Sequence, residues 1–506
     1  MGRLSTVPTY DDVGYFASGT DLLQSIRQDG WRGLSAFLGR DELHSPYSIS
    51  LAALAYSVGG FNDAAPYAAN FILVAVYLCA VAYFVRGCRL ADFCLVLWIA
   101  LMLPFASLAV AEFRPDPAWA IVTGFSVVFV LTRENFFDGW RAAAIFGVLS
   151  GLALLIKPST FALTILALGA AFGGRWLLQC AQTNPRQAGR ALWPSLLAAG
   201  LAVLVIAGPY YAFRGKNIWD YFYINSFGKN ADVWTATGSR WQQWTFYVRK
   251  SGAGSNLGNL YWAVLLGILG LSIWHFRKSS RTGRWKTILL WLVLAAIYAV
   301  NSVESNKTLF LGGAFYGTLI FSAAFFAGAL LTRTPNDSSN YPSRALLVTA
   351  IVMTLLYRWP GYSKADHDRN SASRATSWKS VQQDLPISPP PGKILVTQAG
   401  PIVPENVRIW YLRQNLQTSV QSCAFLRSLD QFKQRLETAD LVITQDQGIL
   451  GNVADLPAEP LQNEFIRTLK SDSAFHLKNL IPIADEKNIY IFARAKASAY
   501  TTPRPY

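Results

Sequence analysis

The chain has 506 residues, of which 52% are hydrophobic and only 15% are charged. A soluble domain usually carries about 25% charged residues, so the composition excludes an ordinary soluble protein and predicts a mainly α-helical, polytopic membrane protein. The net charge of +15 indicates basic cytoplasmic loops, together with any anionic lipid site, rather than nucleic-acid binding. The five cysteines form no CxxC pair, so neither a zinc site nor a disulfide scaffold is predicted.

Two adjacent carboxylates, Asp11 and Asp12, lie in the stretch "VPTYDDVGYF" (7–16) near the start of the chain. Thr9 as N-cap, with Asp12 three residues later, fits a capping box and predicts a helix over 12–28. This interpretation explains Asp12 but leaves Asp11 without a role.

The next apolar stretch, 46–60, has only about fifteen residues. That length is short for crossing a hydrocarbon core about 30 Å thick, so we expect an interfacial helix. Ser45 is a candidate N-cap for it, and Pro46 suits its first turn. His44 precedes them, and a lone loop histidine is more often a surface residue than a ligand.

Ten apolar runs have nearly the length that a helix needs to cross the bilayer. They cover residues 64–85, 90–111, 117–132, 140–156, 158–178, 191–213, 258–276, 284–302, 308–331 and 343–358. The loops on one side are basic, whereas the opposite short loops carry one basic residue each, so the basic loops are predicted to be cytoplasmic. A bacterial inner-membrane protein is expected, with residues 1–63 and the tail after 358 outside the cytoplasm.

This topology requires a membrane helix before residue 7 that carries residues 1–63 across the bilayer. No apolar segment precedes residue 7, so we expect such a helix to be encoded in frame directly upstream of Met1. A stop codon upstream without an apolar run would contradict this expectation and weaken the topology.

The outer segment 214–257 departs from the positive-inside pattern, because it carries six basic residues. Five of them are Arg214, Lys216, Arg240, Arg249 and Lys250. The segment is also aromatic-rich, in "NIWDYFYINSF" and "WQQWTFYV", and such rings suit an interfacial belt.

The tail is predicted to be a small α/β domain. "PISPPPGK" (386–393) is typical of a stiff linker. Strands are expected at 393–400, 439–446 and 488–495, with a helix at 426–437. The tail has no GxGxxG and no P-loop, so docking or acceptor contact is favoured over nucleotide chemistry. The expected division is a first loop at 1–63, a membrane core at 64–358, a linker at 359–392 and an α/β domain at 393–506.

Further charged residues fall at the predicted outer ends of the spans. In "RPDP", Asp116 suits an N-cap and Pro117 the first helical position. Lys157 in "LLIKPST" and Lys307 in "VESNKTLF" lie at helix ends, where snorkelling would explain either of them. The topology places all three charges on the same side as the N-terminal acidic pair. Acids and bases collected at one interface suit a phosphate-bearing amphiphile whose head group lies at that level.

In this order the residues resemble the GT-C superfamily of membrane glycosyltransferases, in particular the branch of protein O-mannosyltransferases and the aminoarabinose transferase of lipid A. The stretches that carry the resemblance are "TYDDVGYF", "LHSPYSISLAALAYSVGG", "EFRPDPAWA", "GLALLIKPSTFAL" and, more weakly, "ESNKTLFLGGAFYG". The resemblance implies a GT-C-like bundle with outer juxtamembrane helices and a variable outer domain. The chain departs from it at Asp12, where many members have Glu, and in "HSP", where many have "HPP", which leaves the sugar and the acceptor open.

The resemblance also implies an inverting transfer of a sugar from a polyprenyl-phosphate carrier to a hydroxyl of a lipid, glycan or protein outside the cytoplasm. Asp11 is the candidate general base, and the transition state would resemble an oxocarbenium ion. The leaving phosphate needs no proton donor but benefits from fixed positive charge. Lys157, Lys307 and the basic residues of segment 214–257, which include Arg249 and Lys250, could provide that charge, and the aromatic rings of this segment could stack on the sugar. The other implied site residues are Asp12 and Asp116 for catalysis, and His44, Lys157, Lys307, Arg214, Lys216, Arg240, Tyr10 and Tyr15 for substrate. A divalent cation held by Asp12, Asp116 and His44 is a further hypothesis.

Three alternatives remain open. A flippase or transporter of a lipid-linked sugar would need polar residues at mid-membrane or broken helices, and the predicted spans hold few charges. An O-antigen-type ligase or polymerase also uses outer-face polyprenyl donors, but usually relies on a large central outer loop and Arg/His chemistry. A non-catalytic membrane scaffold for the tail domain is the third.

Overall fold

The protein forms two compact units in a computed structural model. The described residues are 11–39, 45–111, 113–183, 185–228, 231, 238–304, 307, 310–332, 341–358, 377–397, 402–447, 456–483 and 487–495. The first unit comprises Met1–Arg40, Ile49–Ala68 and Gly361–Tyr506, and the second comprises Asp41–Ser48 and Ala69–Pro360.

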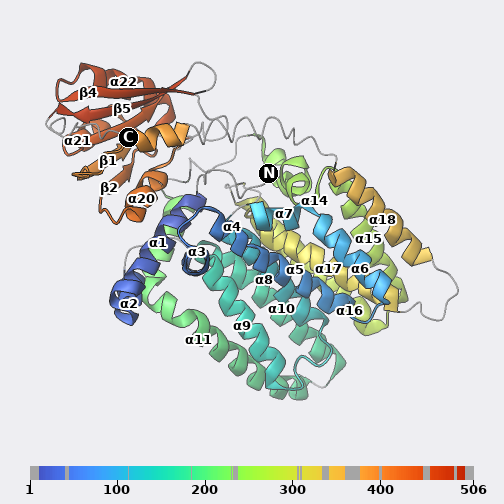
Figure 1. Ribbon diagram of the computed structural model, residues 1–506. Helices are drawn as coiled ribbons and strands as arrows, with labels where there is room; N and C mark the ends of the chain where they lie inside the picture. Colours follow the sequence, from blue (N-terminus) through green and yellow to red (C-terminus); the bar gives the residue numbers. More distant parts are fainter. Residues whose placement is uncertain are drawn as a thin grey trace. The chain divides into compact units, whose positions relative to one another are not determined.

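The second unit is a bundle of apolar helices that run side by side (Figure 1). Its longer helices are α5 Phe71–Val85, α6 Leu90–Met102, α7 Pro104–Ala111, α8 Pro115–Thr132, α9 Trp140–Ile156, α10 Phe161–Gln182, α11 Pro185–Ser226, α15 Tyr261–Lys278, α16 Arg281–Val303, α17 Gly313–Thr332 and α18 Tyr341–Arg358. Short turns of helix lie between them, at η2 Pro158–Thr160, α13 Arg240–Trp244, η3 Phe246–Val248, η4 Lys250–Gly254 and α14 Ser255–Leu257. Each of the ten predicted apolar runs contains helix among the described residues.

The number of membrane spans differs from the predicted ten. Among the described residues, six helices are long and apolar enough to cross a membrane, or eight if each of two bent pairs counts as one span. In one pair, α6 and α7 meet at 65°, because Pro104 opens α7 and forces the preceding Leu103 into an extended backbone. The runs at Trp140–Ile156 and Arg344–Leu355 are helical but shorter. Apolar composition located the helical segments correctly. It overestimated how many of them are straight and long enough to cross a membrane.

Helix α11 is longer than the sequence predicts. It runs unbroken for 42 residues, about 63 Å at 1.5 Å per residue, which is twice the thickness of the hydrocarbon core. Residues 214–226, expected to begin an outer loop, therefore continue this helix as far as Ser226. The charges at 214 and 216 mark where the chain becomes polar, but a change of polarity alone does not end a helix.

Helices α8 and α17 form the centre of the bundle, with most of their residues buried. Their backbones touch at glycines: a Cβ at Gly124 would lie 2.3 Å from the carbonyl carbon of Gly317, and a Cβ at Gly317 would lie 2.2 Å from the oxygen of Ala120. Such close approach between small residues is how membrane helices gain packing energy where the lipid removes the hydrophobic driving force. The N-terminal half of α8, which carries Asp116, thus packs backbone to backbone against α17.

The first unit contains helices from both ends of the chain and a five-stranded sheet. Its N-terminal helices are α1 Asp11–Asp29, α2 Trp31–Gly39, α3 Pro46–Gly59, which it shares with the second unit, and α4 Ala64–Ala69. Helix α1 confirms the helix predicted over 12–28, whereas Thr9, its proposed N-cap, lies outside the described residues. Helix α3 begins as predicted, since the Ser45 hydroxyl accepts the backbone N–H of Ser48 at 3.3 Å.

The C-terminal sheet has the strand order β2-β1-β3-β5-β4. Its elements are β1 Lys393–Val396, α20 Pro404–Arg413, β2 Ser419–Ser422, α21 Leu429–Leu436, β3 Leu441–Gln445, α22 Gln462–Ser471, β4 Phe475–Pro482 and β5 Asn488–Arg494. Strand β1 pairs in parallel with β2 and β3, and β5 pairs antiparallel with β3 and β4. The predicted α/β domain and its three predicted strands are confirmed. Strands β2 and β4 are missed because their residues are mostly not buried, so they lack the apolar run that marks a core strand.

The boundaries of the units differ from the expected division. The core of the sheet includes Trp378, Val381 and Leu385, so residues expected in a linker belong to the packed domain. The N-terminal helices also join this unit, because α1 packs against α20 and Arg408 of α20 forms an ion pair with Asp21 of α1. Pairing between the two ends of the chain has no local signature in the sequence.

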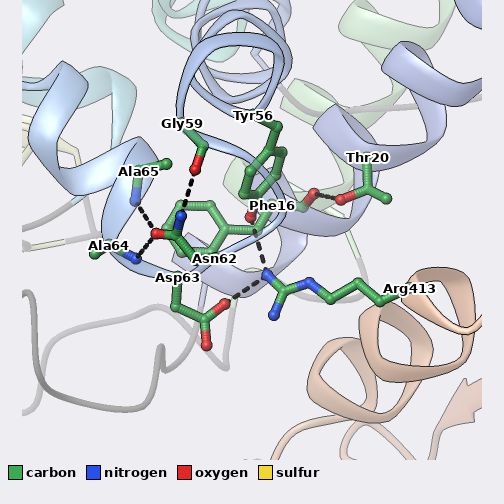
Figure 2. Close-up of polar contacts among 9 residues, drawn as sticks. All are labelled: Phe16, Thr20, Tyr56, Gly59, Asn62, Asp63, Ala64, Ala65 and Arg413. Carbon is green, nitrogen blue, oxygen red and sulfur yellow. Dashed lines mark hydrogen bonds and ion pairs between the residues drawn. The ribbon is translucent and has the colours of Figure 1, made fainter.

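Arg413, at the end of α20, ties the sheet domain to the helix pair α3 and α4 (Figure 2). Its Nη2 donates to the Asp63 carboxylate at 2.6 Å and to the Tyr56 hydroxyl at 3.4 Å. Asn62 orders the turn beside Asp63, since its side chain accepts from the backbone N–H groups of Ala64 and Ala65. The Arg413 guanidinium therefore binds a turn that Asn62 has already ordered.

Replacing Arg413 should weaken the first unit. Arg413→Ala removes one charge-assisted bond and one neutral bond, so we expect the free energy of unfolding to fall by about 2 kcal/mol. Thermal melts of the purified protein measure the change, with the exposed Lys433→Ala as the control that removes an equal charge from the same unit. Equal melting temperatures for the two variants would show that the Arg413 contacts contribute nothing.

Candidate active site

Asp116 lies in the first turn of α8 and not at its N-cap, where the sequence places it. The N-cap is Arg114, with an extended backbone (φ −117°, ψ 155°), and Pro115 takes the first helical position. Both prolines of "RPDP" suit a first turn, where a missing N–H costs no hydrogen bond, so the motif alone could not choose between them. A carboxylate in the first turn is still stabilised by the helix dipole.

The Asp116 carboxylate forms an ion pair with the Lys157 ammonium. Lys157 follows the last residue of α9 and precedes the short helix η2. The two side chains are only 11% and 12% exposed, so Lys157 is held inside the protein and does not snorkel. The lysine Nζ also lies 5.3 Å from the centre of the Trp119 ring, whose own N–H donates to Thr164 at 2.8 Å.

A second acidic and basic pair, Glu304 and Lys307, follows the end of α16. Burial raises the pKa of Glu304, and the positive charges of Lys307 and Lys157 partly offset that rise. Glu304 therefore lies within electrostatic reach of both lysines. This end of the bundle holds two carboxylates and two ammonium groups that come from three different helix ends.

The Lys307 ammonium is fully used within the protein. It donates to the backbone carbonyls of Asn301 at 2.6 Å, of Ser302 at 3.1 Å and of Glu304. A lysine has three N–H donors, so these three carbonyls satisfy it and it closes the C-terminal end of α16. Burial lowers the pKa of Lys307, and the Glu304 carboxylate counteracts part of that effect.

Substitution of Lys307 separates a capping role from a substrate-binding role. Lys307→Ala leaves three carbonyls at the end of α16 without their donor, so we expect unfolding to become easier by about 1–3 kcal/mol. The apparent KM for a lipid-linked donor should stay within about twofold of normal, as in the exposed control Lys433→Ala. A raised KM at an unchanged melting temperature would instead make Lys307 a phosphate ligand.

Arg214 is brought to the same end of the bundle by the unexpected length of α11. It is 7% exposed and, with Pro158 and Ser159 of η2, lines a narrow cavity of about 10 Å³. Lys216 and Arg240 are exposed. The start of α3 is fastened nearby, since the Ser45 hydroxyl donates to the carbonyl of Ile156 at 2.5 Å.

The opposite end of the bundle collects the basic loops. Lys286, near the start of α16, donates to the carbonyl of Thr132 at the end of α8, whereas Asp116 lies at the beginning of α8. Sixteen residues of helix separate the two positions, about 24 Å at 1.5 Å per residue. The acidic and basic cluster and the basic loops therefore occupy opposite ends of the second unit.

The N-terminal acidic pair belongs to the first unit. Asp12 is 2% exposed, and its carboxylate accepts the Tyr67 hydroxyl at 2.6 Å. Tyr15 is also buried. Asp11 is the first residue of α1, but its side chain, like Tyr10 and His44, lies outside the described residues. The structure thus gives Asp12 a partner within the fold and leaves the role of Asp11 as a prediction.

The hypothetical cation site of Asp12, Asp116 and His44 stays a prediction as well. Asp12 and Asp116 belong to different units, and His44 lies outside the described part of the chain. Within that part, no group of three His, Cys, Asp or Glu side chains is spaced to hold a metal ion.

Three residues of this end of the bundle were missed by the sequence analysis. Glu304 lies in the stretch "VESNKTLF", in which the sequence analysis considered only Lys307. Trp119 was hidden in an apolar run, where nothing distinguishes a core tryptophan from one that covers an ammonium group. Asn301 is fully buried, and its side-chain amide has no hydrogen-bond partner among the described residues. The sequence could have indicated it as a candidate, because it is a polar residue near the end of an apolar span.

The bundle of apolar, membrane-length helices and the C-terminal α/β domain define an integral membrane protein. No protein-family model matches the sequence, and no curated protein matches it. Two crystal structures of ArnT from Cupriavidus metallidurans share the fold. The apo structure has a TM-score of 0.59 at 12% identity, covering 99% of this chain and 95% of ArnT. The structure bound to undecaprenyl phosphate has a TM-score of 0.56 at 13% identity, covering 99% and 96%.

At this level of identity the comparison establishes the fold. It confirms the predicted fold class, a GT-C-like bundle followed by an α/β domain, along almost the whole of both chains. The assignment of substrate and of catalytic residues rests on separate arguments.

Proposed function

We propose that the protein is a membrane glycosyltransferase that moves a sugar from a polyprenyl-phosphate carrier to an acceptor hydroxyl on the extracytoplasmic face of a bacterial inner membrane. The observation that carries the proposal is the buried Asp116–Lys157 pair at one end of the bundle. It occurs in a fold that ArnT shares, and ArnT has been crystallised with undecaprenyl phosphate. The acceptor is a lipid, a glycan or a protein, and nucleic acid is not a partner.

Lys157 is the better of the two lysines in the charged cluster for the donor phosphate. Within the described residues its ammonium has one hydrogen-bond acceptor, Asp116, whereas Lys307 donates to three carbonyls. An ammonium with three N–H donors and one protein partner retains donors for phosphate oxygens. Arg214, beside the turn that follows Lys157, adds a second fixed positive charge for the same anion.

Asp116 acts in this proposal as a positioning residue. Its carboxylate fixes the Lys157 ammonium, which the Trp119 ring also contacts, so the cation is oriented before the donor arrives. Preorganised charge of this kind stabilises a leaving phosphate without reorganisation during the reaction. Glu304 lies within electrostatic reach of Lys157 as well.

Asp11 is proposed as the general base. It would take the proton of the acceptor hydroxyl while the hydroxyl oxygen attacks the anomeric carbon and the carbon–oxygen bond to phosphate breaks, with inversion. Two observations favour Asp11 over its neighbour: Asp12 is buried and bonded to Tyr67, and adjacent helical residues point about 100° apart. The other predicted substrate contacts, His44, Tyr10, Tyr15, Lys216 and Arg240, remain part of the proposal.

A transfer assay with purified protein tests the function. Protein in detergent or nanodiscs is mixed with a polyprenyl-phosphate-sugar and a hydroxyl acceptor, and released polyprenyl phosphate is measured. Release that depends on both substrates is expected. Movement of the donor across vesicles without its consumption would identify a flippase, and polymerisation of lipid-linked glycans would identify a ligase or polymerase.

A further inference from the structure

A polar cavity of about 550 Å³ lies at the end of the bundle opposite to Asp116. It is lined by the loop after α8, the C-terminal end of α10 and the N-terminal end of α16. Three of its side chains are cations: Arg175, Arg281 and Lys286. The acid that lines it, Glu134, is 88% exposed and 3.9 Å from Lys286, so the deeper part of the cavity is positively charged.

Arg175 is the feature that points to a ligand. It is only 2% exposed, and although its Nη2 donates to the carbonyl of Glu134, its Nε and Nη1 have no hydrogen-bond partner among the described residues. A buried guanidinium with unused donors is costly unless an anion satisfies them. Arg175 also lines the cavity, so an anion placed there would lie beside the guanidinium and offset its buried charge.

The surroundings identify the anion as a lipid head group. Helices α10 and α16, which enclose the cavity, pack against one another and are both apolar enough to cross a membrane. Their outer faces expose Leu177 and Leu292, each 59% exposed, along which acyl chains can lie. Trp285 lines the cavity and is 43% exposed, as is typical of a tryptophan at head-group level.

We infer that this cavity binds the phosphodiester head group of an anionic phospholipid from the bilayer around the protein. Basic pockets between membrane helices at the positively charged end of a protein hold such head groups. The start of α16 favours the same anion, since its backbone N–H groups carry partial positive charge. The lipid would join α8, α10 and α16 at the end of the bundle remote from the charged cluster.

Thermal melts and native mass spectrometry of the full chain test the inference. Protein is relipidated with phosphatidylglycerol or with phosphatidylcholine, and a third sample receives millimolar inorganic phosphate in phosphatidylcholine. We expect phosphatidylglycerol alone to raise the melting temperature and to remain bound in the gas phase. Equal protection by inorganic phosphate, or none by phosphatidylglycerol beyond phosphatidylcholine, would overturn the lipid assignment.

Variants locate the effect in the cavity. Arg281→Gln should weaken phosphatidylglycerol binding about fivefold, the effect of one basic residue at a membrane surface. Arg141→Gln, an exposed residue at the same end of the bundle, removes the same charge outside the cavity and should leave binding within about twofold of normal. Equal loss in both variants would reduce the effect to general surface charge and overturn the site.

Arg175→Met distinguishes a lipid ligand from a merely structural arginine. Removing a buried, partly unsatisfied charge should leave the melting temperature in phosphatidylcholine nearly unchanged, while abolishing the extra stability in phosphatidylglycerol. A structural arginine would instead lower the melting temperature equally in both lipids, which contradicts the inference. If this variant does not fold, the comparison of Arg281→Gln with Arg141→Gln decides alone.

Discussion

Asp11→Asn is expected to fold, to bind the lipid-linked donor and to transfer sugar 10²–10⁴-fold more slowly, the usual contribution of a general base. This loss corresponds to about 3–5 kcal/mol of activation free energy. The amide cannot take the proton of the acceptor hydroxyl, whereas its size and its place at the start of α1 are those of the carboxylate. The measurements are turnover with a polyprenyl-phosphate-sugar, donor binding and thermal melting. Near-normal turnover would refute the assignment.

Asp12→Asn is the matched control for this experiment. Asp12 is buried and accepts the Tyr67 hydroxyl, so its loss should act on stability, by about 1 kcal/mol, with turnover reduced far less than in Asp11→Asn. Tyr67→Phe removes the same hydrogen bond from the other side and should cost a similar amount. A well-folded but inactive Asp12→Asn would move the base one residue along the chain.

Lys157→Ala is expected to have the second largest effect, about 10²–10³-fold in kcat or in the apparent donor KM, the size of losing one preorganised donor to a developing oxyanion. Lys157→Arg should restore part of the activity, because charge matters more than shape for a point contact, although the two residues are not equivalent. Donor kinetics and binding of undecaprenyl phosphate measure both effects.

The loss of Lys157 also leaves Asp116 buried without its cation, which must be separated from the loss of catalysis. The double variant Lys157→Ala with Asp116→Ala removes the stranded carboxylate. It should regain melting temperature but not activity. Recovery of activity in the double variant would show that Lys157 serves only to neutralise Asp116, and wild-type kinetics in Lys157→Ala would contradict its role altogether.

The sequence predicted what depends on local pattern. Among the described residues, apolar length located each helix that is long enough to cross a membrane, and the Ser45-Pro46 pair correctly marked the start of α3. Prediction from the sequence failed where the role of a side chain depends on its contacts in the folded structure. Lys307 at a helix end is compatible with snorkelling, with a substrate contact or with a cap, and only the positions of three carbonyls distinguish them.

Ion pairs between residues far apart in the chain explain the other features of the structure that the sequence did not predict. The contact of Arg413 with Asp63 joins residues 350 positions apart, and neither residue differs locally from an ordinary surface charge. The same holds for Asp116 and Lys157, whose common side of the membrane was predicted from loop charges but whose direct contact was not. Glu304 was missed for a related reason. Only its burial distinguishes it from an ordinary carboxylate, and the sequence does not show burial.

The glycine contact between α8 and α17 has a mechanical consequence. Where backbones touch at Gly124 and Gly317, no flexible side chain lies between the helices to absorb sliding or tilting. Alternating access in transporters depends on one part of a bundle rocking against another, and movement along this seam would separate backbone atoms in direct contact. Helices α8 and α17 should therefore move as one rigid body that carries Asp116 with it.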